Sequence, residues 1–214
     1  MIKAVLFDLD DLLVDTEGLN IKSMTKTLRK HGIKLTNAEQ KGLIGITNQK
    51  FLNELFKRRK LNHNFKKILE ENFQSYEQLL KDKLRAFPGA MNIVKKLNKK
   101  GFRLAIVSGS TRKQVLIILK KLRIGSFFET IVAYEDVKYG KPSPDPYLTA
   151  VRKLRLKPKD CIVLEDAETG IKSAKRARIK VIGVVNKGRQ SLKMADKVVE
   201  NLNSAYDFIL QGNN

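Results

Sequence analysis

Cysteine is nearly absent from this 214-residue chain, in which Cys161 is the sole example. A single cysteine excludes an intramolecular disulfide and fits a reducing compartment, so we expect a cytoplasmic protein. Long hydrophobic runs are missing too, because the stretch VLIIL at 115–119 is far too short to cross a bilayer. The chain does not open with a basic segment followed by an apolar one, so we expect neither a secretory signal nor a membrane partner.

Acidic residues are scarce relative to basic ones. The chain has 43 Lys and Arg against 22 Asp and Glu, a formal net charge of +21. Such a surface attracts nucleic acid, and it equally attracts small phosphorylated substrates. The basic residues lie within or beside helical patterns such as KKLNKK and LKKLR and form no tail. We therefore favour solvated helix faces over a nucleic-acid surface, and we expect a monomer.

Short apolar runs rich in β-branched residues recur along the chain, at 3–7, 103–107, 130–134, 161–165 and 180–185. Each has the length of a buried strand, and such continuous apolar character is typical of a parallel sheet. Helical patterns at 111–123, 144–154 and 168–178 separate most of the later runs. Strand and helix in alternation predict an α/β fold, a doubly wound parallel sheet of the Rossmann-like kind.

Residues 16–86 interrupt this alternation, because they contain no convincing strand. Helical patterns cover 17–31 and 47–59, and an apolar stripe at spacings of three or four runs through 62–84. The stretch AFPGA at 86–90 breaks the last pattern. We predict an α/β core formed by residues 1–15 and 87–214, with residues 16–86 inserted as a helical cap domain.

Four acids follow the first apolar run, namely Asp8, Asp10, Asp11 and Asp15. Like charges this close repel one another, and burial of any of them is costly without a partner. One interpretation is a solvated acidic loop. The other is that a metal ion, a lysine or both lie among the acids.

The other strand ends favour the second interpretation, because ligands bind at the carboxyl ends of parallel strands. Ser108 and Gly109 follow the second run, Lys141 comes soon after the third, and Glu165-Asp166 ends the fourth. Together they suit phosphoryl transfer. Asp8 and Asp166 could hold Mg²⁺, while Lys141 and Ser108 bind phosphoryl oxygens. One carboxylate could then attack phosphorus while a second moves protons.

Taken singly, each motif is ambiguous, since Asp pairs often cap helices and Ser-Gly or Pro-rich stretches often form turns. Their conjunction in order closely resembles the haloacid dehalogenase superfamily. The matching stretches are FDLDDLLVDTE at 7–17, VSGST at 107–111, GKPSPDPY at 140–147 and LEDAETGI at 164–171. The chain looks like the subgroup with a helical cap after the first strand, which includes β-phosphoglucomutase and sugar-phosphate phosphatases.

The resemblance implies that Asp8 is the nucleophile and forms an aspartyl-phosphate. It implies that Asp10 is the general acid and base, with its backbone carbonyl a ligand of Mg²⁺. Many relatives have glycine at the next position, where this chain has Asp11. We expect the backbone N–H of Asp11 to keep a phosphate contact.

The same resemblance assigns the remaining core residues. Asp166 would bind Mg²⁺ together with Asp8, and Glu165 would assist. Ser108, Gly109 and Lys141 would bind the phosphoryl group, and Lys141 would also keep the nucleophile ionised. The resemblance implies an Mg²⁺-dependent phosphoric monoester hydrolase.

The cap departs from the phosphoglucomutases. Asn20 stands where those relatives carry a histidine, and Asn48 stands in place of an arginine, which argues for a phosphatase. Gly45, Thr47 and Lys50 could line the site, or they could simply form a turn and helix cap.

Three functions stay open at this point. The first is a Mg²⁺-dependent phosphatase for a small phosphorylated metabolite. The second is a β-phosphoglucomutase-like phosphomutase. The third is a catalytically weak protein of this fold that binds nucleic acid through its basic surface, against which the retained acids and Lys141 argue.

Overall fold

The computed structural model describes residues 1–44, 46–186 and 191–212. Its contacts divide the chain into two compact units, Met1–Asp15 with Arg85–Asn214, and Thr16–Leu84. The predicted boundary lay after residue 86, two positions later. Arg85 and Ala86 belong to the α/β unit because the Asp15 N–H donates to the Arg85 carbonyl at 2.9 Å and Ala86 pairs with Val14.

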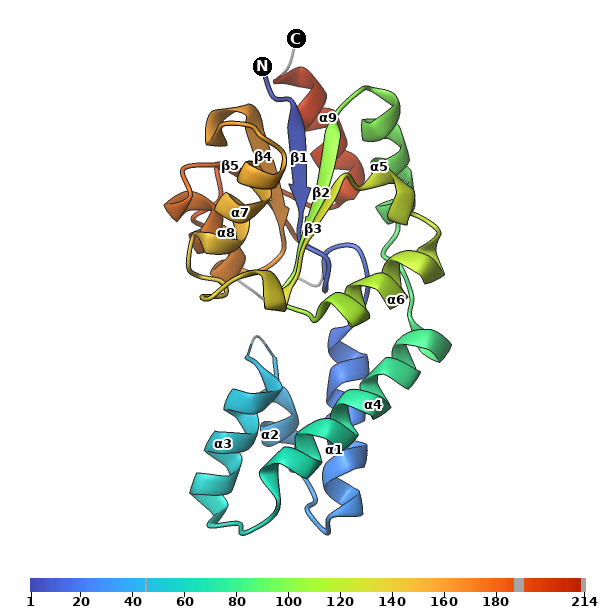
Figure 1. The fold of residues 1–214 in the computed structure, drawn as a ribbon, viewed down its shortest axis with the longest axis vertical. Helices are drawn as coiled ribbons and strands as arrows, with labels where there is room; N and C mark the ends of the chain where they lie inside the picture. Colours follow the sequence, from blue (N-terminus) through green and yellow to red (C-terminus); the bar gives the residue numbers. More distant parts are fainter. Residues whose placement is uncertain (45, 187–190, 213–214) are drawn as a thin grey trace. The chain divides into compact units, whose positions relative to one another are not determined.

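The α/β unit is built on one six-stranded sheet in the order β3-β2-β1-β4-β5-β6, with every neighbouring pair parallel (Figure 1). This confirms the predicted doubly wound fold, and all five predicted strands are present. The strands are β1 (Ala4–Phe7), β2 (Arg103–Val107), β3 (Thr130–Val132), β4 (Cys161–Glu165), β5 (Lys180–Val184) and β6 (Lys197–Val199).

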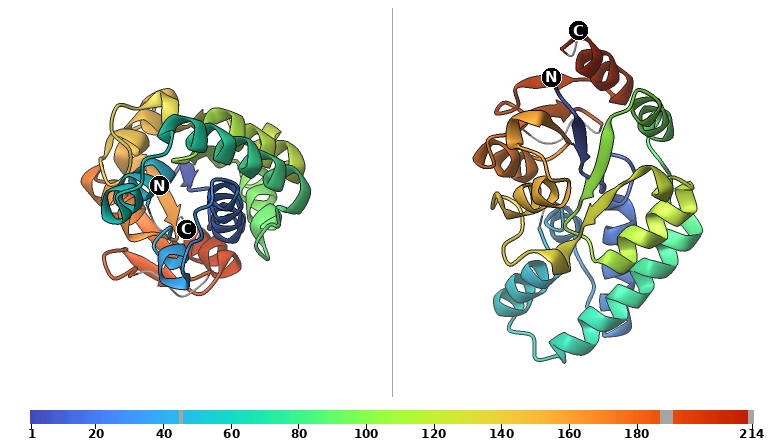
Figure 2. Two further views of the ribbon diagram at one scale, coloured as in Figure 1. Left: turned by 90° about the horizontal axis from the view of Figure 1, so that it is seen from below. Right: turned by 45° about the horizontal axis from the view of Figure 1, so that its top comes forward.

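Helices cover both faces of this sheet. They are α5 (Ala90–Lys99), α6 (Arg112–Leu122), α7 (Asp145–Lys153), α8 (Glu168–Arg176) and α9 (Leu202–Gln211), with short 3₁₀ turns η1 (Gly125–Phe127), η2 (Tyr134–Asp136) and η3 (Pro158–Asp160). Helices α7 and α8 pack on one face of the strands, and α5 and α9 pack together on the other (Figure 2). No helix in the described ranges is long and apolar enough to span a membrane.

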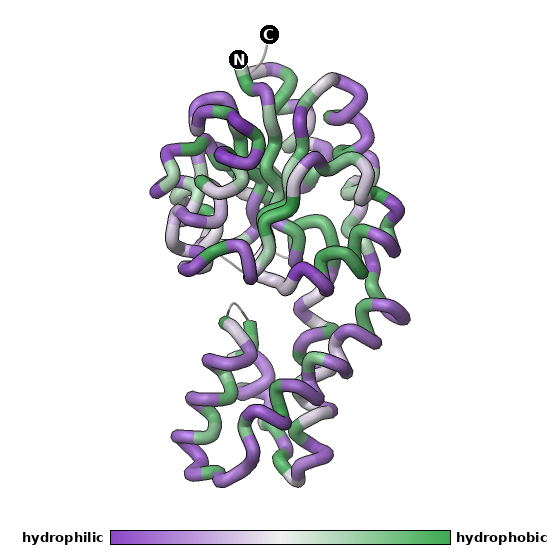
Figure 3. The backbone as a smooth tube through the Cα atoms, viewed as in Figure 1, coloured by the Kyte–Doolittle hydropathy of each residue, from purple (hydrophilic) through white to green (hydrophobic). Residues whose placement is uncertain are grey.

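The central strands form the core, and the backbone tube is coloured hydrophobic along them (Figure 3). All four residues of β1 are fully buried, as a strand covered by helices on both faces requires. Ala4 and Leu6 face the cluster formed with α7 and α8, while Phe7 packs edge to face on Phe128 with 5.9 Å between ring centroids. Burial of this apolar surface is the main force that fixes the strand order.

The second unit is all helical, as predicted. Its helices are α1 (Glu17–Lys30), α2 (Asn37–Lys41), α3 (Asn48–Arg59) and α4 (Phe65–Lys83). Met24, Leu28, Leu52 and Ile68 are fully buried in its core. Glu39 on α2 caps its own helix through Thr36 and accepts hydrogen bonds from Arg58 and Arg59, which ties α2 to α3.

Candidate active site

The carboxyl edge of the sheet gathers the predicted motifs. Phe7 at the end of β1 pairs with Ile106 of β2 on one side and with Leu164 of β4 on the other. The residues that follow these strands, Asp8 and Ser108 among them, therefore emerge side by side. Motifs that are far apart in the sequence therefore lie close together, because the register of the parallel strands places their carboxyl ends at the same edge of the sheet.

Lys141 is the central cation of this cluster. Its Nζ donates to Asp8 Oδ1 at 2.5 Å, to Glu165 Oε1 at 2.6 Å and to the Val107 carbonyl at 2.9 Å. It also lies 5.0 Å from the ring centroid of Tyr147. Burial alone would lower the pKa of Lys141, but the two carboxylates outweigh burial and raise that pKa. The side chain therefore stays an ammonium ion at all working pH values.

Glu165 is completely buried and serves as the second partner of Lys141. Its Oε1 also accepts from the Tyr147 hydroxyl at 2.6 Å, and its Oε2 accepts from the Ala167 N–H at 3.3 Å. Gly170 lies against this carboxylate, and a Cβ there would overlap it. The structure thus holds Glu165 rigidly beside the predicted metal site, with both oxygens engaged by the protein.

Three carboxylates, those of Asp8, Glu165 and Asp166, approach one another so closely that their ligand oxygens lie within 4.8 Å. Burial raises the pKa of Asp166 to about 9, with Asp8 and Glu165 adding to the rise. Burial also raises the pKa of Asp8 in spite of Lys141. Lys141 lowers the pKa of Asp8, as expected of a neighbouring cation, but burial and the charges of Glu165 and Asp10 raise it further.

The charge balance of this cluster fits a divalent cation. If all three carboxylates were ionised, with one ammonium ion beside them, the cluster would carry two negative charges in a buried place. Carboxylate oxygens are the ligands that Mg²⁺ prefers, and two positive charges would compensate the excess. Asp8 and Asp166 are the residues that could hold it, with Glu165 behind them.

Two serine hydroxyl groups hold Asp10. Its Oδ2 accepts from Ser108 Oγ at 2.9 Å and from Ser110 Oγ at 2.7 Å, and the Ser110 N–H donates back to Ser108 Oγ at 2.9 Å. Ser108 was predicted to contact phosphate, and in this structure its hydroxyl holds Asp10. Ser110 was not predicted, although it stands in the VSGST stretch. A Cβ at Gly109 would meet nothing within 4 Å, so packing does not require glycine there.

Asp11 adopts a left-handed backbone conformation with φ of 60°. Its N–H was predicted to contact phosphate, and in this structure it donates to the Val14 carbonyl at 2.8 Å. The Asp11 carboxylate is still close enough to help raise the pKa of Asp166. Asn186, beyond the end of β5, donates to the carbonyls of Asp11 and Leu12 at 2.9 and 2.8 Å. No sequence motif pointed to Asn186.

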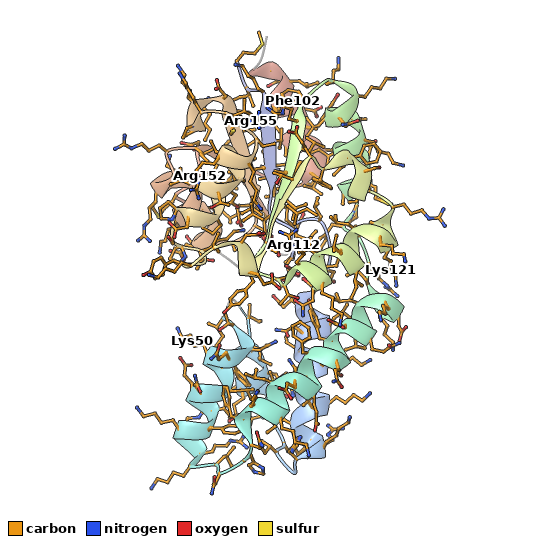
Figure 4. The ribbon with its side chains drawn as sticks, in the orientation of Figure 1. Lys50, Phe102, Arg112, Lys121, Arg152 and Arg155 are labelled. Carbon is orange, nitrogen blue, oxygen red and sulfur yellow. The ribbon has the colours of Figure 1, made fainter. Side chains whose placement is uncertain are left out.

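Arg112 fixes the start of α6, which carries the serine turn at its N-terminus (Figure 4). Its backbone N–H donates to the Glu135 carboxylate, and its guanidinium donates to Asp136 at 2.5 Å. Burial would raise the pKa of Asp136, but hydrogen bonds from Ala133 and Lys153 and the charges around it lower that pKa. The turn is thereby tied to the 3₁₀ turn after β3.

The predicted cap residues lie in the helical unit. Asn48 at the start of α3 donates to Asn20 Oδ1 on α1 at 3.0 Å, so the two substituted positions contact each other. Thr47 accepts from the Lys50 N–H at 3.2 Å and so caps α3. The Lys50 side chain is largely exposed (Figure 4). Gly45 lies outside the described residues.

Comparison with known proteins agrees with the geometry. A family of haloacid dehalogenase-like hydrolases matches residues 5–184. The chain is 29% identical over 189 residues to a phosphorylated carbohydrates phosphatase of Thermotoga maritima, covering 86% of each chain. It is 28% identical over 183 residues to the pyrophosphatase PpaX of Oceanobacillus iheyensis, covering 86% of this chain and 83% of that protein.

Solved structures share the fold. One is a β-phosphoglucomutase from Clostridium difficile, with a TM-score of 0.83 and 25% identity. The match covers 99% of this chain and 96% of that chain.

Proposed function

The chain belongs to the haloacid dehalogenase-like hydrolases and is a hydrolase of phosphoric monoesters, and from this premise we propose that it releases phosphate from a small phosphorylated metabolite with Mg²⁺ bound. The observation that carries this proposal is the cluster of three carboxylates around Lys141, with Asp10 held beside it. A sugar phosphate is the substrate class we favour, since one relative is a phosphorylated carbohydrates phosphatase.

In the first step, an Asp8 carboxylate oxygen attacks phosphorus and the bond from phosphorus to the ester oxygen breaks. Asp10 donates its proton to the leaving oxygen, which departs as the alcohol. Lys141 binds one side of the phosphoryl group and stays protonated throughout. Mg²⁺ held by Asp8 and Asp166 would neutralise phosphoryl charge, so that an anionic nucleophile can approach a dianion.

In the second step, Asp10 acts as a base. It takes a proton from a water molecule while the water oxygen attacks the phosphorus of the aspartyl-phosphate. The bond from phosphorus to Asp8 breaks, and phosphate and the original carboxylates are restored. Both serine hydroxyls donate to Oδ2 of Asp10, which assigns the transferred proton to Oδ1.

We favour a phosphatase over a phosphomutase because of Asn20 and Asn48. Neither side-chain amide carries a charge or a titratable proton, and the Asn48 amide donates a hydrogen bond to the Asn20 amide. A bisphosphorylated sugar presents a second dianion, which is recognised best by a fixed cation such as arginine. The likeness to a β-phosphoglucomutase keeps the mutase as the alternative outcome of the test.

The test is phosphate release from hexose phosphates, phosphoglycolate, nucleotides and pyrophosphate, with Mg²⁺ and with EDTA. We expect metal-dependent release that Asp8→Asn abolishes. Asp207→Asn, an exposed change on α9, should retain full activity. Undiminished release in EDTA, or by Asp8→Asn, would contradict the proposal. Isomerisation that requires a sugar bisphosphate and releases no phosphate would establish the mutase.

A further inference from the structure

The loop after β1 contains a backbone conformation that L-amino acids rarely adopt. Asp11 lies in the left-handed region, where a Cβ crowds the following carbonyl and glycine is favoured. It follows Asp10 directly, so its conformation sets the direction in which the chain leaves Asp10. The structure must supply contacts that hold this turn.

Part of the loop is held from its apolar side. Leu9, Leu12, Leu13 and Val14 are fully buried. The N–H groups of Leu13 and Val14 donate to the Leu9 carbonyl at 3.0 and 3.3 Å, and the Asp11 N–H donates to the Val14 carbonyl. These contacts satisfy the carbonyls of Leu9 and Val14 and leave those of Asp11 and Leu12 to be held from elsewhere.

Asn186 holds the carbonyls of Asp11 and Leu12. Its side-chain nitrogen lies 2.9 and 2.8 Å from them, across 175 residues of sequence. Asn186 is itself fixed, because its N–H donates to the Val184 carbonyl and the Val185 N–H donates to Val199 of β6. In the sheet, β4 lies between β5 and β1. The Asn186 side chain, just beyond the end of β5, therefore links that strand by hydrogen bonds to the loop after β1.

We infer that Asn186 is a positioning residue, whose amide holds the Asp11 turn and thereby keeps Asp10 in place for proton transfer. This inference rests on the proposed function. The role requires a hydrogen-bond donor, since two carbonyl oxygens face the side chain. Aspartate has the same shape, but it would set a carboxylate against two carbonyl oxygens.

The first test compares steady-state kinetics of Asn186→Ala and Asn186→Asp with the wild-type chain. We expect kcat to fall about tenfold or more while KM changes little, because misplacement of a catalytic group costs rate more than binding. Exposed Asn98 on α5 supplies matched controls, Asn98→Ala and Asn98→Asp, which should leave kcat unchanged. Wild-type kcat in both Asn186 variants would overturn the inference. A raised KM with wild-type kcat would assign the amide to substrate binding and also overturn it.

The second test is rescue. Glycine adopts the left-handed conformation without a Cβ penalty, so Asp11→Gly should restore most of the kcat that Asn186→Ala loses. The effect is read against Asp11→Gly alone, as a double-mutant cycle. A loss that Asp11→Gly does not restore would mean that Asn186 acts by another route.

Hydrogen exchange supplies a readout that does not need activity. Amides of the peptide covering residues 9–15 should exchange faster in Asn186→Ala than in the wild type, and Asp11→Gly should slow them again. If the wild-type protein releases no phosphate and Asn186→Ala still exchanges faster, the anchoring role stands and the proposed function is rejected. Unchanged exchange together with unchanged kcat would reject the anchoring role itself.

Discussion

Asp10 and Asp8 are two residues apart and lie in opposite environments. Asp8 is buried against an ammonium ion and two carboxylates, whereas Asp10 accepts hydrogen bonds from two neutral hydroxyls. Strand alternation does not explain this division, because residues two apart on a strand share a face. Both acids follow the end of β1 at Phe7, so the loop directs their side chains to different partners. The two roles proposed for these acids, nucleophile and proton carrier, thus follow from the different surroundings of two aspartate side chains.

Removal of the Ser110 hydroxyl tests the orientation of Asp10. We expect Ser110→Ala to lower kcat about tenfold, about 1.4 kcal/mol, since one hydrogen bond to an ionised group is lost. Ser110→Thr keeps a hydroxyl and should retain most of the activity. Ser126→Ala, at an exposed serine of η1, is the matched control. Steady-state kinetics with unchanged kcat in Ser110→Ala would show that Ser108 alone suffices.

Asp166 makes the metal-free protein sensitive to pH. Its pKa in the folded chain is about 9, above the ordinary value of 3.8. Between these values the folded state keeps a proton that the unfolded state has lost, so the free energy of unfolding falls as pH rises. The loss begins above the ordinary pKa and is complete above about 9. Thermal unfolding in EDTA across this window should show the decline, and Asp166→Asn should flatten it.

Mg²⁺ should cancel this pH dependence. Binding must displace the proton from Asp166, so affinity should rise by up to about tenfold per pH unit below pH 9. We therefore expect the rise in unfolding temperature caused by Mg²⁺ to grow with pH. An equal rise at every pH would mean that no proton leaves Asp166 when the metal binds.

Secondary structure elements differed in how far the sequence could predict them. The bounds of β2 and β4 agree with the predicted runs because four of the five residues in each run, RLAIV and CIVLE, are apolar. Strand β6 was missed because it has three residues, two of them exposed, and α2 was missed because it has five residues. Short, half-exposed elements contain too few apolar residues for a helical or strand-like hydrophobic periodicity to be recognised.

The residues of the candidate site also differ in how far the sequence could predict them. Asp8, Asp166 and Lys141 could be predicted to lie together, because each follows a strand and parallel strands end at one edge. Ser110, Tyr147 and Asn186 could not be assigned their contacts, since those contacts depend on side-chain directions and on loops distant in sequence. The charged groups of the site could therefore be predicted from the order of the motifs, whereas the groups that orient them could be identified only from the structure.

Helix α6 links the serine turn to the sheet through its N-terminal cap. Thr111 accepts from the Gln114 N–H, and the Gln114 side chain accepts from the Thr111 N–H at 3.1 Å. We expect Thr111→Ala to lower the free energy of unfolding by about 1 kcal/mol. Thr111→Ser keeps the capping hydroxyl and should cost much less. Urea unfolding measures both, and an equal loss in both variants would indicate that the methyl group, not the cap, is responsible.

At the scale of the whole molecule, the surface is more basic than composition alone suggests. Of the 22 acidic residues, Asp8, Glu165 and Asp166 lie in the candidate site, where Lys141 is the cation paired with them. The net charge of +21 therefore resides largely on exposed Lys and Arg. Such a field should concentrate a dianionic substrate near the protein.

This field predicts how activity responds to salt. The screening length falls from about 30 Å at 10 mM to about 10 Å at 0.1 M salt. We expect kcat/KM for a phosphate monoester to fall several-fold over this range while kcat stays nearly constant, because salt weakens capture and not chemistry. A singly charged substrate analogue should respond less. Constant kcat/KM would show that the basic surface does not steer substrate, and salt-sensitive inhibition by DNA or RNA would then assign that surface to a polyanionic partner.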